Sequence, residues 1–104
     1  MKGTEKQIAW AKDIIKSGVD YLDERIAYDK ELGLSGSHEI AYRILRAAYN
    51  NLLYIAPDAA RIIDNRRQFS GSQIEKDACW FENILNSGKL TADELAAKNG
   101  VMIY

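Results

Sequence analysis

Apolar side chains fall on two opposite faces of the segment 8–28. One stripe has the spacing of three and four residues that is typical of an amphipathic helix, and it consists of Ile8, Ala11, Ile15, Val19, Leu22 and Ile26. At 100° per residue a second stripe lies about 180° away, and it consists of Trp10, Ile14, Ser17, Tyr21 and Tyr28. A helix with two apolar faces needs cover from two directions. We expect either a central helix of a small bundle, or an interface with a partner or a second copy through Trp10, Tyr21 and Tyr28.

Capping signals place the first two helices. The run Thr4-Glu5-Lys6-Gln7 has the form of a capping box, in which the Thr hydroxyl accepts from the N3 amide and the Gln side chain reaches back. It predicts a first helix from there to about Leu32, with Gly18 as a weak point where a bend is favoured. After a Gly- and Ser-rich break, Ser37 is the expected N-cap of a second helix over about 38–56.

Further signals divide the second half of the chain. Pro57 suits the first turn of a short helix over about 58–67, and Phe69 begins the expected linker after it. Two more capping boxes, at 72–75 and 91–94, predict the starts of two later helices. The expected buried stripe of the first of these consists of Ile74, Ala78, Phe81 and Leu85, widened by Trp80 and Ile84. The last helix is expected to stop at Asn99-Gly100. The apolar tail 101–104 that follows is expected either to dock on the core or to be disordered.

The second helix is apolar almost all the way round, which is typical of a helix in the middle of a fold. Its apolar residues are Ile40, Ala41, Tyr42, Ile44, Leu45, Ala47, Ala48, Tyr49, Leu52, Leu53 and Ile55. One narrow polar strip remains, within about 80° on the wheel, and it consists of Arg43, Arg46, Asn50 and Tyr54.

These patterns predict one all-α domain over 1–104, a compact bundle of about four to five helices with a long first helix and a buried second helix. No alternating apolar run competes as a strand. The length of 104 residues is enough for a core that folds without a metal or disulfide. Cys79 is the only cysteine, so we expect a reducing compartment, the cytoplasm by default. No apolar run has the roughly 18 residues of a membrane-spanning helix, so no membrane association is expected.

Candidate chemistry is sparse. His38 and Cys79 are single residues of their kind, and neither belongs to a metal-ligand spacing, so we expect no metal, no cofactor and no enzymatic activity. The acids of the first helix alternate with lysines and Arg25, which favours a solvated surface of mixed charge over a pair of catalytic carboxylates. These acids are Asp13, Asp20, Asp23, Glu24, Asp29 and Glu31.

The middle third of the chain carries its positive charge on arginine alone. Residues 36–70 hold five arginines and three acids in a protein whose net charge is −1. One interpretation pairs Arg43 and Arg46 with acids of the first helix. A second makes them part of a surface for a protein partner, since Arg and Tyr are enriched at interface hot spots. That surface would consist of Arg43, Arg46, Asn50, Tyr54, Arg61, Arg66 and Arg67. A third is direct contact with nucleic acid, with phosphates on the arginines and bases on tyrosine.

Two short motifs carry a resemblance. The run Gly3-Thr4-Glu5-Lys6-Gln7-Ile8-Ala9-Trp10-Ala11 resembles the opening of small helical, mostly uncharacterised proteins of bacterial phages and other mobile elements. Ile63-Asp64-Asn65-Arg66 is similar to a second element of some of them. The resemblance implies a setting in which accessory proteins, anti-CRISPR inhibitors among them, act by binding other macromolecules. We therefore expect a protein-binding inhibitor or regulator, with a nucleic-acid-binding accessory protein as the alternative and a homodimer as a further expectation.

Overall fold

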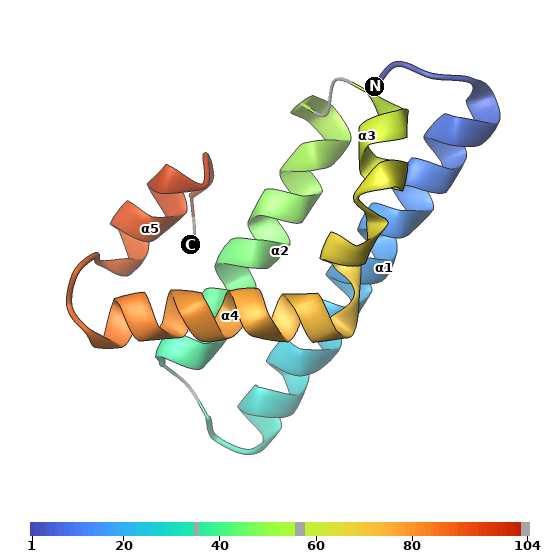
Figure 1. The fold of residues 1–104 in the computed structure, drawn as a ribbon. Helices are drawn as coiled ribbons and strands as arrows, with labels where there is room; N and C mark the ends of the chain where they lie inside the picture. Colours follow the sequence, from blue (N-terminus) through green and yellow to red (C-terminus); the bar gives the residue numbers. More distant parts are fainter. Residues whose placement is uncertain (35, 56–57, 103–104) are drawn as a thin grey trace.

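The long first helix is present in the computed structural model, which describes residues 1–34, 36–55 and 58–102 (Figure 1). This helix, α1, spans Glu5–Glu31. The elements that follow are α2 (Ser37–Ile55), α3 (Ala59–Asp64), the 3-10 helix η1 (Arg66–Phe69), α4 (Gly71–Asn86) and α5 (Ala92–Lys98). Within the three described ranges no β-strand is formed, so the protein is an all-α bundle.

The helices pack in two directions. In Figure 1, α1 and α2 lie side by side and run in opposite directions, while α4 crosses both. α3 and η1 follow the N-terminal half of α1, where the amide of Ala59 donates to the carbonyl of Lys2 at 2.8 Å. α5 packs against α2 at the far side of the bundle. α2 is therefore covered by α1, α4 and α5, as its apolar circumference predicted.

The core lies where α1, α2 and α4 meet. The first stripe of α1 is confirmed, because Ala11, Ile15, Val19 and Leu22 are buried. Side chains from the other elements complete this core, chiefly Ala41, Tyr42, Leu45, Tyr49, Phe69, Ile74 and Ala78. A smaller cluster of Ile44, Leu95 and Ala96 joins α2 to α5.

Gly18 is a point of close packing and α1 continues through it. A Cβ atom at this position would lie 3.1 Å from Cδ2 of Tyr49 and 3.3 Å from Cβ of Phe69. The rings of Tyr49 and Phe69 pack edge to face beside Gly18, with 4.8 Å between the ring centroids. The expectation that Phe69 belongs to a linker was therefore wrong, since its side chain is buried in the core. Because Phe69 is flanked by polar residues in the sequence, no apolar pattern indicated that its side chain is buried.

Two of the expected capping boxes are confirmed, and two cap positions are corrected. Thr4 caps α1 and Thr91 caps α5, each with its reciprocal Gln or Glu bond. α2 already includes Ser37, whose hydroxyl instead donates to Oδ1 of Asn86 at 2.7 Å. α4 begins two residues earlier than expected, because the hydroxyl of Ser70 accepts from the amide of Gln73.

The end of α2 and one position in the middle of α4 are more exposed than the apolar pattern predicted. Ile55, expected among the apolar residues of the buried helix, is exposed at the end of α2, whereas the exposure of Tyr54 agrees with its expected place on the polar strip. Trp80, expected to widen the buried stripe of α4, is 66% exposed. Val101 packs against the smaller cluster while Met102 is exposed; the expectations for Pro57, for the end of the second helix at residue 56 and for residues 103–104 lie outside the described residues. No helix in the described part of the chain is long and apolar enough to span a membrane.

Candidate functional site

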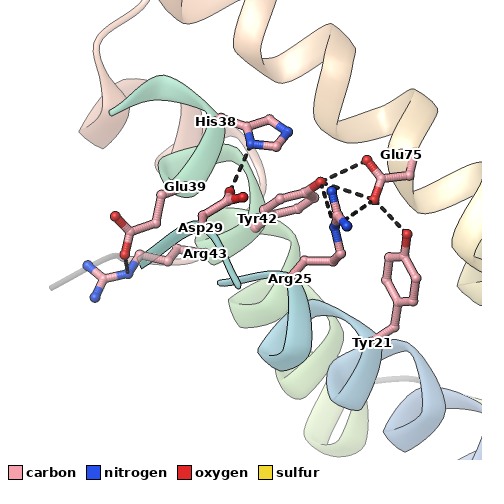
Figure 2. Close-up of polar contacts among 8 residues, drawn as sticks. All are labelled: Tyr21, Arg25, Asp29, His38, Glu39, Tyr42, Arg43 and Glu75. Atoms are coloured by element: carbon pink, nitrogen blue, oxygen red, sulfur yellow. Dashed lines mark hydrogen bonds and ion pairs between the residues drawn. The ribbon is translucent and has the colours of Figure 1, made fainter. Parts of the chain in front are cut away.

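A polar cluster ties α1, α2 and α4 together around the carboxylate of Glu75 (Figure 2). The hydroxyl of Tyr21 donates to Oε1 of Glu75 at 2.6 Å, and that of Tyr42 donates to Oε2 at 2.7 Å. Arg25 completes the cluster, with its Nε 3.4 Å from Oε1 of Glu75. The ring of Tyr21 also packs on α4, where a Cβ added to Gly71 would meet it at 3.0 Å.

The electrostatics of this cluster keep both tyrosines protonated. Burial raises the pKa of Tyr42 to about 12, and the hydrogen bond to Glu75 acts in the same direction while the bond from Arg25 opposes it. Burial and the bond to Glu75 also raise the pKa of Tyr21. Each hydroxyl thus remains a donor to the carboxylate at neutral pH. The cluster thus links α1, α2 and α4 through hydrogen bonds and an ion pair. Tyr21, proposed from the sequence as part of an exposed stripe, belongs to this cluster.

A second polar pair closes the corner between α1 and α2. The carboxyl of Asp29 is 1% exposed, and its Oδ2 lies 2.8 Å from Nδ1 of His38. Figure 2 shows the imidazole directed at this carboxyl. The imidazole also packs edge-on against the ring of Tyr42, with 4.6 Å between the ring centroids. The expectation that Asp29 lies on a solvated surface was wrong. A signal was available, because Asp29 follows Ala11 by five whole helical turns and so falls on the buried stripe.

The arginines of α2 are engaged in ion pairs. Arg46 pairs with Asp23 of α1, which confirms the structural interpretation for this residue. Arg43 lies 3.6 Å from Glu39, one turn earlier on its own helix. Asn50 and Tyr54 lie further along α2 and line a shallow cavity of about 530 Å³ with the end of α5; the Tyr54 side chain is 85% exposed. Asn50 and Tyr54 therefore line a different cavity from the ones that Arg61, Arg66 and Arg67 border.

Trp10 and Arg66 come together although they are far apart in the sequence. The guanidinium carbon of Arg66 lies 5.9 Å from the centroid of the Trp10 ring, within the range of a cation–π contact. One of its nitrogens, Nη1, also donates to the carbonyl of Ile63 at 3.0 Å, which fixes its direction. Trp10 is half exposed. The guanidinium of Arg66, oriented by its hydrogen bond, and the half-exposed ring of Trp10 therefore share one patch of surface.

Arg66 also borders a polar cavity of about 710 Å³ between the end of α3, η1 and the first turns of α4. The residues that line it are Asp64, Asn65, Arg66, Arg67, Gln68, Gln73 and Asp77. The side-chain amide of Gln73, through Nε2, donates to Oδ1 of Asp77 at 3.0 Å, so this wall is ordered by an internal hydrogen bond. Arg67 is exposed and forms no ion pair within the described ranges.

The other two candidates lie apart from this cavity. Arg61 is exposed and borders a smaller space of about 270 Å³ beside Asp58 and Leu52. Tyr28 is half exposed, and the guanidinium of Arg25 lies 5.3 Å from its ring centroid. The structure therefore brings Trp10 against Arg66, which shares a cavity with Arg67, and leaves the other residues proposed from the sequence outside this cavity.

Nothing in the described part of the chain resembles a metal centre, since no group of three or more His, Cys, Asp or Glu side chains is placed to hold an ion. Comparison with protein-family models, with curated proteins and with solved structures finds no match to this chain.

Proposed function

We propose that the protein acts by binding a protein partner through the Trp10, Arg66 and Arg67 surface, together with the polar cavity that the two arginines border. The observation that carries this proposal is the half-exposed Trp10 ring beside a guanidinium fixed by the Ile63 carbonyl. Trp and Arg are the residue types most enriched at interface hot spots, where they anchor complexes through packing and directed hydrogen bonds. A prepositioned pair loses less conformational freedom when it binds.

The charges of this surface favour a protein over a nucleic acid. Two carboxylates, those of Asp64 and Asp77, line the same cavity as Arg66 and Arg67. A phosphate backbone requires a surface that is positive along its length, whereas this cavity alternates in sign and the whole protein has a net charge of −1. Mixed charge is typical of the polar rim of a protein interface.

The resemblance of the first residues to accessory proteins of phages and mobile elements supports a role as an inhibitor or regulator, of the kind that anti-CRISPR proteins have, acting in the cytoplasm without catalysis. A homodimer would use the exposed aromatic residues of α1. These are Trp10 and Tyr28, because the hydroxyl of Tyr21 is bound to Glu75.

The test is comparative capture from a host lysate with immobilised protein. The variant combines Arg66→Ala with Arg67→Ala, and the matched control combines Lys89→Ala with Lys98→Ala, which removes two exposed charges from the region of α5. We expect a protein retained by the wild type and the control to be retained about tenfold less by the arginine variant. Equal retention by all three proteins would contradict the proposed surface.

A gel-shift experiment separates the alternative. If the arginines bind nucleic acid, the wild type retards DNA or RNA at low salt, and the retardation disappears steeply as salt rises. We expect no retardation at any salt concentration that keeps the protein folded.

A further inference from the structure

Both tryptophans of this protein are exposed. Trp10 is 50% exposed and Trp80 is 66% exposed, and the sequence contains no other tryptophan. Trp is highly buried on average, and an indole ring left in water forfeits a large gain in free energy from burial. The apolar pattern of α4 places Trp80 beside the buried stripe, yet the bundle leaves it outside. Trp80 therefore needs an explanation that the fold does not supply.

The position of Trp80 connects it to the cavity described above. It follows Asp77 by three residues and Gln73 by seven on the same helix. At 100° per residue, its Cβ direction is about 60° from that of Asp77 and about 20° from that of Gln73. Residues three apart on a helix are surface neighbours. Trp80 lies outside the lining of the cavity but next along the same face of α4 as Gln73 and Asp77, while Trp10 contacts Arg66, which lines the cavity.

We infer that Trp80 is the second anchor of this surface and that its occupant is a protein segment carrying one carboxylate next to an apolar or aromatic side chain. The inference rests on the proposed function and names the partner's chemistry. The carboxylate would bind Arg67, and the flat or apolar side chain would pack on Trp80.

Charge complementarity supports this occupant. Arg66 already donates to a backbone carbonyl and lies over Trp10, whereas Arg67 forms no ion pair in the described part of the chain. A guanidinium presents planar, paired donors that fit a carboxylate bidentately. Asp77 is bound by Gln73 and adds negative charge to the opposite wall, as Asp64 does near the arginines. With two arginines and two aspartates the lining of the cavity has no net charge, so a single carboxylate gains its attraction from direct contact with Arg67, whereas a chain of phosphates would also meet both aspartates.

The two tryptophans make the test direct, because fluorescence reports on each half of the surface separately. Trp10→Phe leaves Trp80 as the reporter, and Trp80→Phe leaves Trp10. The probes are a synthetic peptide with a central Phe-Glu-Phe flanked by Gly and Ser, the same peptide with Gln for Glu, and oligothymidylate. We expect the Glu peptide to change the emission of both single-tryptophan proteins and to bind about tenfold more tightly than the Gln peptide.

Arg67→Gln should remove the preference for the Glu peptide, and Lys89→Gln, a matched neutralisation in the turn before α5, should preserve it. Emission that responds to oligothymidylate but to neither peptide would overturn the inference in favour of base stacking. A response of Trp10 alone would remove Trp80 from the surface, and a response of neither would reject the carboxylate chemistry. In both of those cases the capture experiment still decides the proposed function, because it depends only on Arg66 and Arg67.

Discussion

His38 holds the buried carboxyl of Asp29 at 2.8 Å, across the turn that joins α1 to α2. The same residue, Asp29, accepts the amide of Leu34 at its backbone carbonyl at 2.7 Å. One residue at the end of α1 therefore organises both the turn and the first residues of α2. Because the Asp29 side chain is removed from water, the hydrogen bond from the imidazole of His38 offsets the cost of burying this carboxyl.

Replacing His38 with Ala is expected to destabilise the fold by about 2 kcal/mol, because a buried carboxyl then loses its hydrogen-bond partner. Urea unfolding followed by circular dichroism measures this loss. His38→Asn keeps a short polar side chain and should recover part of it, while Lys30→Ala, beside Asp29 but exposed, should change stability by less than about 0.5 kcal/mol. Equal effects of His38→Ala and Lys30→Ala would mean that the pair contributes nothing.

The close approach at Gly18 gives a second prediction, opposite to what helix propensity suggests. Ala in place of Gly in a helix gains about 1 kcal/mol, but here the new methyl group would press on Tyr49 and Phe69. Overpacking costs about 1–3 kcal/mol, so we expect Gly18→Ala to lower the free energy of unfolding. The neighbouring exposed Ser17→Ala should raise it slightly. Stabilisation by Gly18→Ala would show that the contact relaxes freely.

High pH tests the buried tyrosines. Burial raises the pKa of Tyr42 to about 12 and also raises the pKa of Tyr49, both from an ordinary value of 10.0. The unfolded chain therefore loses these protons first. The stabilising contribution of the two tyrosines is fully present below about pH 10 and falls above it by about 1.4 kcal/mol per pH unit for each group. Thermal melts at increasing pH should show this slope. Tyr49→Phe should make it shallower, and an unchanged slope would contradict the assignment.

Truncating a leucine in the core of α1 and one at the rim of the core on α2 should cost different amounts of stability. Leu22 is fully buried between the helices, whereas Leu52 only packs against the edge of the core. Leu22→Ala should cost about 2–5 kcal/mol, and Leu52→Ala clearly less, since a partly exposed site leaves a smaller cavity. Chemical denaturation of both variants gives the comparison. A cost for Leu52→Ala equal to that for Leu22→Ala would place the end of α2 inside the core.

The parts of the fold that depend on neighbouring residues were predictable. The capping boxes at Thr4 and Thr91 are local patterns, and both form as expected. The parts that failed depend on which side of a helix meets another element. The apolar character of Trp80 gave no indication that the bundle has no partner for it, and the polar neighbours of Phe69 hid its place in the core.

The candidate site follows the same division. The arginine content of residues 36–70 drew attention to Arg66 and Arg67, but only folding shows that Trp10 meets the first of them. The cluster around Glu75 was missed for the same reason, because its members come from three helices and share no spacing. Asp29 is the exception, since its place on the buried stripe was visible in the sequence.

The start of α4 offers the sharpest test of the corrected boundaries. The sequence favours Ser72 as the cap, because a Glu follows three residues later, whereas in the structure the hydroxyl of Ser70 accepts from the amide of Gln73 and donates to the carbonyl of Arg67. Ser70→Ala removes an N-cap and should cost about 1 kcal/mol, while Ser72→Ala, inside the first turn, should change stability by less than about 0.5 kcal/mol. Parallel urea titrations measure both changes. The reverse order would restore the helix start expected from the sequence, and with it the expected linker before α4.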